Sequence, residues 1–256
     1  MNYVEAAKKA AKEAGEMLLQ YQGKEKHVHF KAHRDIATKA DKDSETLLHK
    51  ILIEDGFPEH DFLSEESDFK GGSADYRWIV DPIDGTGNFA HENPLFCVSV
   101  GLQHKNEVIA GAIYCPTMDE MFSAEKGKGA FLNGKQVHCS KQDKFFDLLL
   151  ALEMPPKENI IRRTLLIEKN FALHHRVRTL GSSALDLAYI ACGRFDAFIS
   201  AYLYAWDVAA GIVIAHEAGG EATHHNGKQV DLNSIHFDFA ASNGILHKQL
   251  IEKIKA

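Results

Sequence analysis

Two aspartates follow directly on an apolar run near residue 80. Trp78-Ile79-Val80 leads into Asp81, and Asp84 comes after two further residues, Pro82 and Ile83. A short apolar run of this kind predicts a buried strand, and a carboxylate at its end is costly to bury unless something neutralises it. Mg²⁺ takes oxygen ligands in octahedral geometry, so these two side chains are suited to holding a divalent cation.

A candidate anion site follows immediately along the chain. Gly85 and Thr86 open a new element, and backbone N–H groups at the start of a helix can hold a phosphate. Gly85 also allows the backbone to approach a ligand closely, because glycine has no Cβ. A cation site and an anion site within a few residues of each other predict metal-assisted phosphate chemistry.

Further acids stand at the ends of other expected elements: Asp35, Asp41, Glu65, Glu66 and Asp207. Acids near helix N-termini also cap the helix and interact favourably with its dipole. Taken alone, Asp207 is therefore explained by capping as well as by catalysis. Capping is the better explanation for Asp41 alone, and Glu65-Glu66 alone would be a solvated loop.

The elements that must position these residues follow from the spacing of apolar residues. Helices are expected over 3–20, 43–54, 157–171, 183–192, 207–218 and 246–255. Strands are expected over 61–63, 76–80, 95–102, 108–114, 121–124, 130–132, 148–152, 195–200 and 239–242, with one more near Val177. Residues 28–41 are expected to be extended or looped.

This pattern changes along the chain. The first part mixes helices with antiparallel hairpins, and the last part alternates strands with helices, which favours layered sheets and helices in the α+β to α/β range. A boundary near residue 145 would divide the chain into an N-terminal part, 1–145, with the metal and phosphate motifs, and a C-terminal part, 146–256, with Asp207. The active site is then expected between the two parts.

Composition narrows the classes of function. The 256 residues include 45% hydrophobic and 25% charged residues, as in a globular protein of one large domain or two closely packed ones. A net charge of -7 without a long basic run argues against nucleic-acid binding as the main role. No apolar stretch approaches the ~20 residues that span a bilayer, and the amphipathic N-terminus is unlike a signal peptide. The four cysteines lack paired spacing and are expected to be reduced thiols of a cytoplasmic protein.

Two long motifs resemble the signatures of a known enzyme family. Trp78–Phe89 with His91 resembles the first signature of the inositol monophosphatase family of Mg²⁺-dependent phosphatases, and Trp206–Gly211, continuing to Gly220, resembles the second. The resemblance extends to Lys31 with residues 35–41, to 64–67, to 125–134 and to 241–244. It therefore covers nearly the whole chain, and its motifs occur in the family's order.

The resemblance implies a fold and an activity. The fold would be the layered α-β-α-β-α sandwich of the inositol monophosphatase and fructose-1,6-bisphosphatase type, usually as a homodimer. The activity would be that of a lithium-sensitive phosphomonoesterase with two to three Mg²⁺ ions per site. A metal-activated water would attack a small phosphate monoester, with inositol monophosphate as the default substrate.

The resemblance also implies roles for individual residues. One Mg²⁺ would be held by Glu65, Asp81 and the carbonyl of Ile83, a second by Asp81, Asp84 and Asp207, and a weaker third near Glu65. Gly85 and Thr86 would supply N–H groups to the phosphate. Thr86 with Asp35, and Glu65 through its metal, would help to activate the water. Lys31, Asp41 and Glu66 would support this set.

Substrate contacts are implied at Gly181, Ser182, Ser183 and Ser200. Ser183 replaces the family's usual alanine, and Ser200 stands where the family has the acid that reads inositol, so fructose-1,6-bisphosphate, NADP(H) and a nucleotide 3′,5′-bisphosphate remain alternatives. The last is disfavoured because residues 85–89 read Gly-Thr-Gly-Asn-Phe. A regulatory protein that binds transcription machinery is the alternative of another class, although the complete set of carboxylates favours a working enzyme.

Overall fold

The computed structural model describes residues 2–21, 28–32, 35–66, 72, 74–153, 171, 176–234 and 236–255. For 28–32 and 35–38 it describes the backbone only, so the side chains of Lys31 and Asp35 lie outside it. The helix expected over 157–171 also lies outside the described residues, apart from Phe171. None of the helices formed by the described residues is long and apolar enough to cross a membrane.

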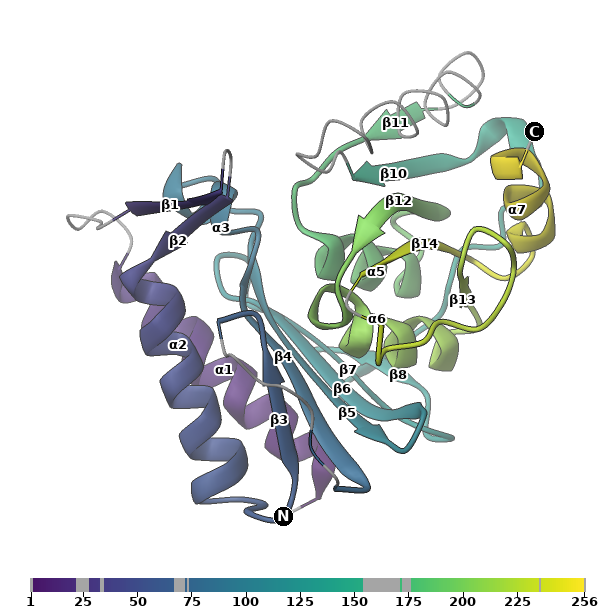
Figure 1. The fold of residues 1–256 in the computed structure, drawn as a ribbon. Helices are drawn as coiled ribbons and strands as arrows, with labels where there is room; N and C mark the ends of the chain where they lie inside the picture. The colour runs from purple at the N-terminus through teal and green to yellow at the C-terminus, as the bar shows by residue number, and fades with distance from the viewer. Residues whose placement is uncertain are drawn as a thin grey trace.

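Seven strands in the first half of the chain form one twisted sheet (Figure 1). They are β3 (Asp61–Ser64), β4 (Tyr76–Asp84), β5 (Cys97–His104), β6 (Glu107–Cys115), β7 (Glu120–Glu125), β8 (Ala130–Leu132) and β9 (Lys135–Val137), in spatial order. Only β3 and β4 are parallel, and the other neighbours pair antiparallel. Antiparallel neighbours can be joined by short turns, and both expected hairpins are present, with turns at Lys105-Asn106 and 127–129.

Five strands in the second half form another sheet, in the order β11-β10-β12-β14-β13. They are β10 (Leu149–Glu153), β11 (Arg176–Arg178), β12 (Ala197–Leu203), β13 (Glu221–Thr223) and β14 (Phe237–Ser242). β10 pairs parallel with both β11 and β12, whereas β14 pairs antiparallel with β12 and β13. The two sheets flank residue 145, and the division of the chain into two parts there stays a prediction.

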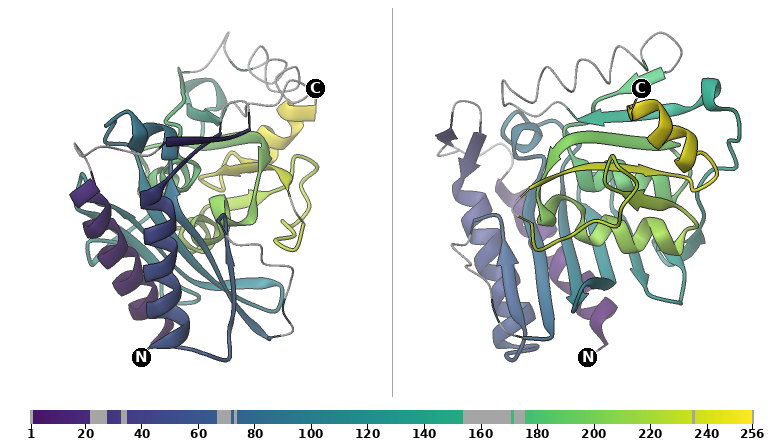
Figure 2. Two further views of the ribbon diagram at one scale, coloured as in Figure 1. Left: turned by 60° about the vertical axis from the view of Figure 1, so that its left-hand side comes forward. Right: turned by 45° about the vertical axis from the view of Figure 1, so that its right-hand side comes forward.

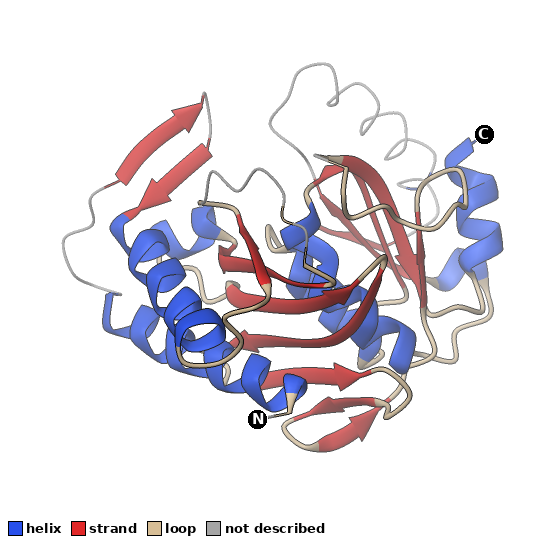
Figure 3. Cartoon of the chain, turned by 60° about the horizontal axis from the view of Figure 1, so that its bottom comes forward, coloured by secondary structure: helices blue, strands red, loops and turns tan. Residues whose placement is uncertain are grey.

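The helices form three layers around these sheets (Figures 1 and 2). α1 (Tyr3–Tyr21) and α2 (Lys39–His49), which continues into a π-helical turn over Lys50–Glu54, cover the outer face of the seven-stranded sheet. α5 (Ser183–Ala191) and α6 (Ala205–Glu217) lie between the sheets, and α7 (His247–Lys255) covers the outer face of the five-stranded one. The expected α-β-α-β-α sandwich is confirmed, and Figure 3 shows helices on both faces of the strands.

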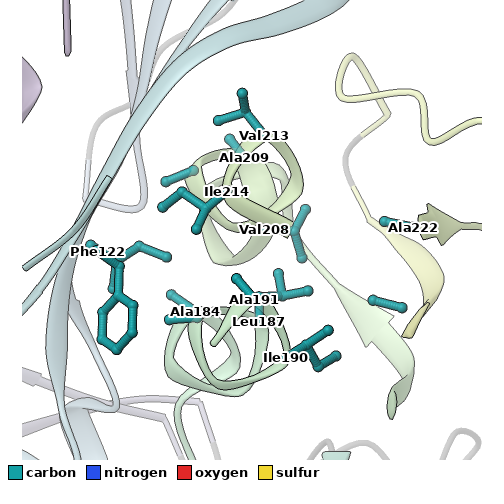
Figure 4. Close-up of a cluster of buried hydrophobic side chains, with 14 of the residues drawn as sticks. Phe122, Ala184, Leu187, Ile190, Ala191, Val208, Ala209, Val213, Ile214 and Ala222 are labelled. Atoms are coloured by element: carbon teal, nitrogen blue, oxygen red, sulfur yellow. The ribbon is translucent and has the colours of Figure 1, made fainter. Parts of the chain in front are cut away.

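Glycines bring α6 unusually close to the seven-stranded sheet. Gly101 and Gly111 face each other across β5 and β6. A Cβ on Gly101 would lie 2.9 Å from the Ala209 Cβ, and one on Gly111 would lie 2.9 Å from the Ala210 Cα. These distances are shorter than any normal contact between non-bonded atoms. The two glycines therefore form a flat surface against which α6 packs. Figure 4 shows α6 beside α5, with Ile214 of α6 on the side toward α5 and Ala209 on the side away from it.

The structure differs from the expected elements in a few places. α2 starts at Lys39 rather than residue 43. The stretch expected to be extended or looped, 28–41, contains the antiparallel pair β1 (Val28–Ala32) and β2 (Asp35–Thr38) and the start of α2. β4 continues past Val80 to Asp84, and α6 starts at Ala205, two residues before the expected start. The short strands β9 and β13 and the 3₁₀ turn over Phe145–Asp147 are additional. The element expected to open at Gly85-Thr86 is the short helix α3 (Thr86–Ala90).

Candidate active site

A β-bulge brings the two aspartates of β4 to the same face of the sheet. Before the bulge, Val80 packs in the cluster under α1 and α2, while Ile79 packs toward α5 and α6, as alternation along a strand requires. Three steps along β4, from Asp81 to Asp84, then match only two steps along β5, from Ser99 to Cys97. The extra residue shifts the alternation by one, so both carboxylates face the layer that contains α5 and α6.

Asp84 is held by the N-terminal end of α5. Its Oδ2 atom accepts a hydrogen bond from the Ser182 hydroxyl at 2.6 Å and one from the Ala184 N–H at 2.7 Å, and the Cys97 thiol lies 3.6 Å away. Burial raises the pKa of Asp84, and the hydrogen bonds from Ser182 and Ala184 offset part of that rise. These donors fix the carboxylate of Asp84 at the junction of β4 and α5.

Asp207 enters the site from the first turn of α6. Its Oδ2 atom accepts a hydrogen bond from the Tyr204 N–H at 2.8 Å, which forms one half of a capping box. Asp207 therefore caps its helix. Burial first, and then the charge of Asp84, raise the pKa of Asp207 well above its usual range. Capping and a role in the site are compatible at this position.

Asp81 stands at the centre of a group of acids. It is 2% exposed, and its Oδ1 atom accepts a hydrogen bond from the Ile83 N–H at 3.0 Å. Burial first, and then the charges of Glu65, Asp84, Asp207 and Asp41, in that order, raise the pKa of Asp81 well above its usual range. The structure therefore brings together acids from four separate stretches of sequence.

The remaining acids approach from the edge of this group. Glu65 follows β3 and is exposed, whereas Asp41, in the first turn of α2, is 1% exposed. Burial, and then the charge of Glu66, raise the pKa of Glu45, which indicates that Glu66 and Glu45 are neighbours. Asp35 lies on β2, whose backbone packs against α3.

The turn after β4 has the backbone form expected of a close-approach site. Gly85 has φ 90° and ψ 39°, and a Cβ there would lie 3.0 Å from the Leu95 carbonyl and 3.1 Å from the Gly181 carbonyl. Both the left-handed backbone and the lack of space require glycine. The Thr86 hydroxyl donates to the Ile83 carbonyl at 2.9 Å. The first N–H groups of α3 have no partner within the helix and point outward from its start.

Asn88 ties this turn to the second half of the chain. Its side-chain amide donates to the Leu95 carbonyl at 2.6 Å and to the Leu180 carbonyl at 2.7 Å, immediately before Gly181. The predicted substrate loop, residues 181–183, is therefore fixed against α3. Asn88 belongs to the first motif, but sequence reasoning assigned no role to it, because its two acceptors are backbone atoms that only the fold brings near.

The predicted substrate residues differ in how they are placed. Ser182 and Ser183 are buried at the start of α5, and Ser182 already donates to Asp84. Ser200 is 0% exposed, and its hydroxyl bonds to the backbone of Tyr202, donating to the carbonyl at 3.2 Å and accepting from the N–H at 3.3 Å. The Ser200 hydroxyl thus serves a local turn in β12.

Two acids that sequence reasoning missed, Asp186 and Glu153, lie behind this group. Asp186 is fully buried in α5, and neither of its oxygens has a hydrogen-bond partner among the described residues. Burial, then the charges of Glu153 and Asp84, raise the pKa of Asp186 well above its usual range. The available signal was a single carboxylate among the apolar residues of α5, a pattern that is costly unless the group has a function or a partner.

The donor set fits a hard divalent cation by its chemistry. Apart from the exposed Glu65, it consists of buried carboxylates whose mutual repulsion a cation would relieve. Among the described hydrogen bonds, those to Asp81, Asp84 and Asp207 each meet one oxygen of the carboxylate, which leaves a second oxygen to face an ion. No three described histidine, cysteine, aspartate or glutamate side chains already surround a single point, so these side chains would have to turn to bind.

Comparisons with known proteins show the family to which this chain is related. The model of the "Inositol monophosphatase family" matches residues 2–256. An "Inositol monophosphatase" of Mesembryanthemum crystallinum is 37% identical over 262 residues, covering 99% of this chain and 96% of the relative. A "Putative Nus factor SuhB" of Neisseria meningitidis serogroup A is 35% identical over 259 residues, covering 99% of this chain and 98% of the relative.

A solved structure supports the same assignment. The "extragenic suppressor protein suhB from Bartonella henselae" has a TM-score of 0.92 and 34% identity, and the match covers 98% of this chain and 97% of the other. The match to the family model spans the motifs around Asp81 and Asp207 and everything between them. This chain, with its acids gathered where two layers meet, belongs to the inositol monophosphatase family and is a phosphoric monoester hydrolase.

Proposed function

We propose that this protein is a Mg²⁺-dependent phosphomonoesterase that hydrolyses inositol monophosphate to inositol and phosphate. The observation that supports this most is the position of Asp81, which is buried among the carboxylates of Asp41, Glu65, Asp84 and Asp207. Such a group of acids is unfavourable without a cation. Relatives named for inositol monophosphatase activity, in a family that is generally metal-dependent, support the substrate and the metal.

The residues proposed to hold the ions are Glu65, Asp81, Asp84, Asp207 and the carbonyl of Ile83, with Asp81 shared between two ions and a third, weaker ion near Glu65. Bound Mg²⁺ would supply positive charge to the phosphate and lower the pKa of a coordinated water. Gly85 and Thr86 would donate N–H groups to the phosphate at the start of α3. Ser182 keeps Asp84 oriented through its hydroxyl.

Other residues have supporting roles in this proposal. Thr86 and Asp35 would orient the attacking water, and Lys31 would contact the phosphate or a water. Asp41 and Glu66 would add negative charge that favours ion binding. The active site would lie between the parts 1–145 and 146–256, because Asp84 and Asp207 come from the two different parts. A homodimer, sensitivity to lithium and a cytoplasmic location stay predictions.

A substrate screen tests the proposed function. Phosphate release is measured with and without Mg²⁺ from myo-inositol 1-phosphate, fructose-1,6-bisphosphate, NADP and adenosine 3′,5′-bisphosphate. We expect Mg²⁺-dependent release from the inositol ester, lost in Asp84→Asn, which keeps the shape of the side chain but removes its charge. A folded wild-type protein that releases no phosphate from any of these esters would contradict the proposal.

A regulatory role is a second candidate, because one relative is named as a putative Nus factor. In this case the protein would bind transcription machinery independently of catalysis. A pull-down that is indifferent to Mg²⁺ and survives Asp84→Asn would support the role. Loss of binding together with activity in that variant would count against it.

A further inference from the structure

Asn88 lies in α3, where three segments of the chain meet. Its side-chain amide donates to the Leu95 carbonyl, shortly before β5, at 2.6 Å and to the Leu180 carbonyl, shortly before α5, at 2.7 Å. The Gly181 carbonyl lies 3.5 Å from the same nitrogen atom. An amide nitrogen carries two hydrogens, so the two short bonds use its full donor capacity and fix which way the amide points.

The loop before α5 passes closely over this amide. Gly181 has φ 75°, and a Cβ there would lie 3.2 Å from the Asn88 Nδ2 atom. The Gly181 carbonyl also lies against the turn after β4, where a Cβ on Gly85 would be 3.1 Å away from it. The positive φ and the lack of space both favour glycine at residue 181. The loop is therefore packed against both the start of α3 and the Asn88 side chain.

The same loop holds Asp84. In the residue after Gly181, the Ser182 hydroxyl donates to the Asp84 Oδ2 atom at 2.6 Å, and the Ala184 N–H donates to the same atom at 2.7 Å. Asp84 and Ser182 are both buried, so the carboxylate depends on these donors rather than on water. A shift of the loop would move the donors away from Asp84.

These contacts close a ring. It runs along the chain from Asp84 into α3, crosses from Asn88 to Leu180 and returns from Ser182 to Asp84. Among the hydrogen bonds of the described residues, those from Asn88 are the ones that join α3 to residues 180–181. Each link in a closed ring limits the movement of the others, so Asn88 restricts where Ser182 can place its hydroxyl.

We propose that Asn88 is a positioning residue for the metal site, which holds residues 180–181 against α3 and so keeps Ser182 in place to orient Asp84. The inference rests on the proposed Mg²⁺-dependent function and deepens it, because Asp84 is a proposed ligand. Asn88 acts through Ser182 and is not itself a ligand. Its amide suits this role, since alanine would leave the two carbonyls without a donor and aspartate would turn an oxygen toward them.

Amide hydrogen exchange in the metal-free protein tests the first step. In Asn88→Ala, with a chelator present, exchange of the Ala184 N–H should become faster by about tenfold or more, because the loop no longer holds the start of α5 against Asp84. This measurement needs neither metal nor activity. Thermal unfolding shows that the variant is folded.

Asn243→Ala is the matched control. The side-chain amide of Asn243 also donates to backbone carbonyls, to that of Ser140 at 3.2 Å and to that of Gln142 at 2.8 Å, after β14 and away from the acids. Its loss removes the same kind of contact. We expect exchange of the Ala184 N–H in this variant to stay within about twofold of wild type.

The dependence of activity on Mg²⁺ tests the second step. In Asn88→Ala, the Mg²⁺ concentration for half-maximal phosphate release from myo-inositol 1-phosphate should rise by about tenfold, as for other partners that orient metal ligands. Asn88→Asp should raise it further, because a carboxylate oxygen would face the Leu95 and Leu180 carbonyl oxygens. Asn243→Ala should stay within about twofold of wild type.

A double variant shows whether Asn88 acts through Ser182. Asn88→Ala combined with Ser182→Ala should shift the half-maximal Mg²⁺ concentration by no more than about threefold beyond Ser182→Ala alone, since the hydrogen bond that Asn88 positions is already lost. Independent effects would multiply, and that result would overturn the proposed role.

The outcomes separate this inference from the proposed function. Exchange at Ala184 and Mg²⁺ dependence in Asn88→Ala that match those of Asn243→Ala would overturn the role of Asn88 and leave the proposed function standing. Absence of Mg²⁺-dependent release by the wild-type protein would overturn the proposed function and with it the link from Asn88 to a metal. Exchange at Ala184 in chelator would still decide whether Asn88 holds the loop.

Discussion

A buried carboxylate without a counter-charge destabilises a fold, and Asp81 has four acidic neighbours and a water-excluded position. A carboxyl whose pKa is raised on folding binds protons more tightly when folded than when unfolded. The free energy of unfolding therefore falls as pH rises above the ordinary aspartate pKa of 3.8 toward the raised value. Cation binding to the folded protein opposes this loss.

Asp81→Asn tests this linkage. In a chelator at pH 7.5, the variant should be more stable than wild type by about 1–3 kcal/mol, because an unfavourable buried charge is removed. The difference should shrink toward pH 4, where Asp81 is protonated, and should reverse with Mg²⁺, which stabilises only the wild type. Urea unfolding at several pH values measures it. A variant less stable than wild type in chelator at pH 7.5 would contradict the assignment.

Ser182 orients Asp84, so its loss should weaken the site without removing a proposed ligand. Ser182→Ala is expected to raise the Mg²⁺ concentration for half-maximal activity by about 10–100-fold, the range found for partners that orient metal ligands. Ser234→Ala, in the loop before β14, is the matched control. Unchanged Mg²⁺ dependence in Ser182→Ala would show that Asp84 does not need this hydrogen bond.

At the scale of elements, the flat surface formed by Gly101 and Gly111 fixes the position of α6 on the sheet, and with it the position of Asp207. Gly101→Ala should destabilise the protein by about 1–3 kcal/mol through overpacking against Ala209 and should lower activity. Gly87→Ala is the control for stability, because a Cβ there meets nothing within 4 Å. Equal melting temperatures for Gly101→Ala and wild type would contradict the close packing of α6.

Local pattern predicted most elements but not the bulge. The expected strand ended at Val80, because the apolar run stops there and Asp81 follows. In the structure β4 continues through Pro82, whose carbonyl accepts a hydrogen bond from the Ser44 hydroxyl at 3.0 Å, and it reaches Asp84. The bulge depends on pairing with β5 and on packing against α5 and α6. Neither contact can be inferred from residues that are close in sequence.

The helix α2 starts earlier than expected for a similar reason. The sequence predicted a helix from residue 43, since the apolar spacing is clear from Leu47 onward, but the helix starts at Lys39. Asp41 is then buried in its first turn near Asp81, a contact that depends on the sheet. β13 and β9, with three residues each, are too short to show a pattern. β13 pairs with the longer strand β14, and β9 pairs with β8 in a tight hairpin.

At the scale of the whole molecule, the acids join segments that are far apart in sequence. Asp84 ends a strand of the seven-stranded sheet, and Asp207 starts a helix that follows the five-stranded sheet's β12. Their motifs identified both residues, but Glu153 and Asp186 carried no motif that sequence reasoning used. The neighbourhood of Glu153 follows from the pairing of β10 with β12, a long-range contact that no short window contains.

Cation binding should therefore couple the two sheets. With Mg²⁺, amide hydrogen exchange should slow by about tenfold or more both at the end of β4, around Asp84, and in the first turn of α6, around Asp207. The two regions should change at the same Mg²⁺ concentration, and neither should change in Asp84→Asn. Slowing at one region alone would show that the ion does not bridge the two segments.

The most direct measurement of the site is a crystal structure with Mn²⁺ in place of Mg²⁺, together with phosphate, using the anomalous signal of the metal. We expect at least two Mn²⁺ ions that share Asp81, about 3.5–4 Å apart, with Asp84 and Asp207 on one ion and Glu65 on the other. Phosphate should lie between the ions and the N–H groups of Gly85 and Thr86. Metal peaks elsewhere in the protein, with none at Asp81, would contradict the proposed site.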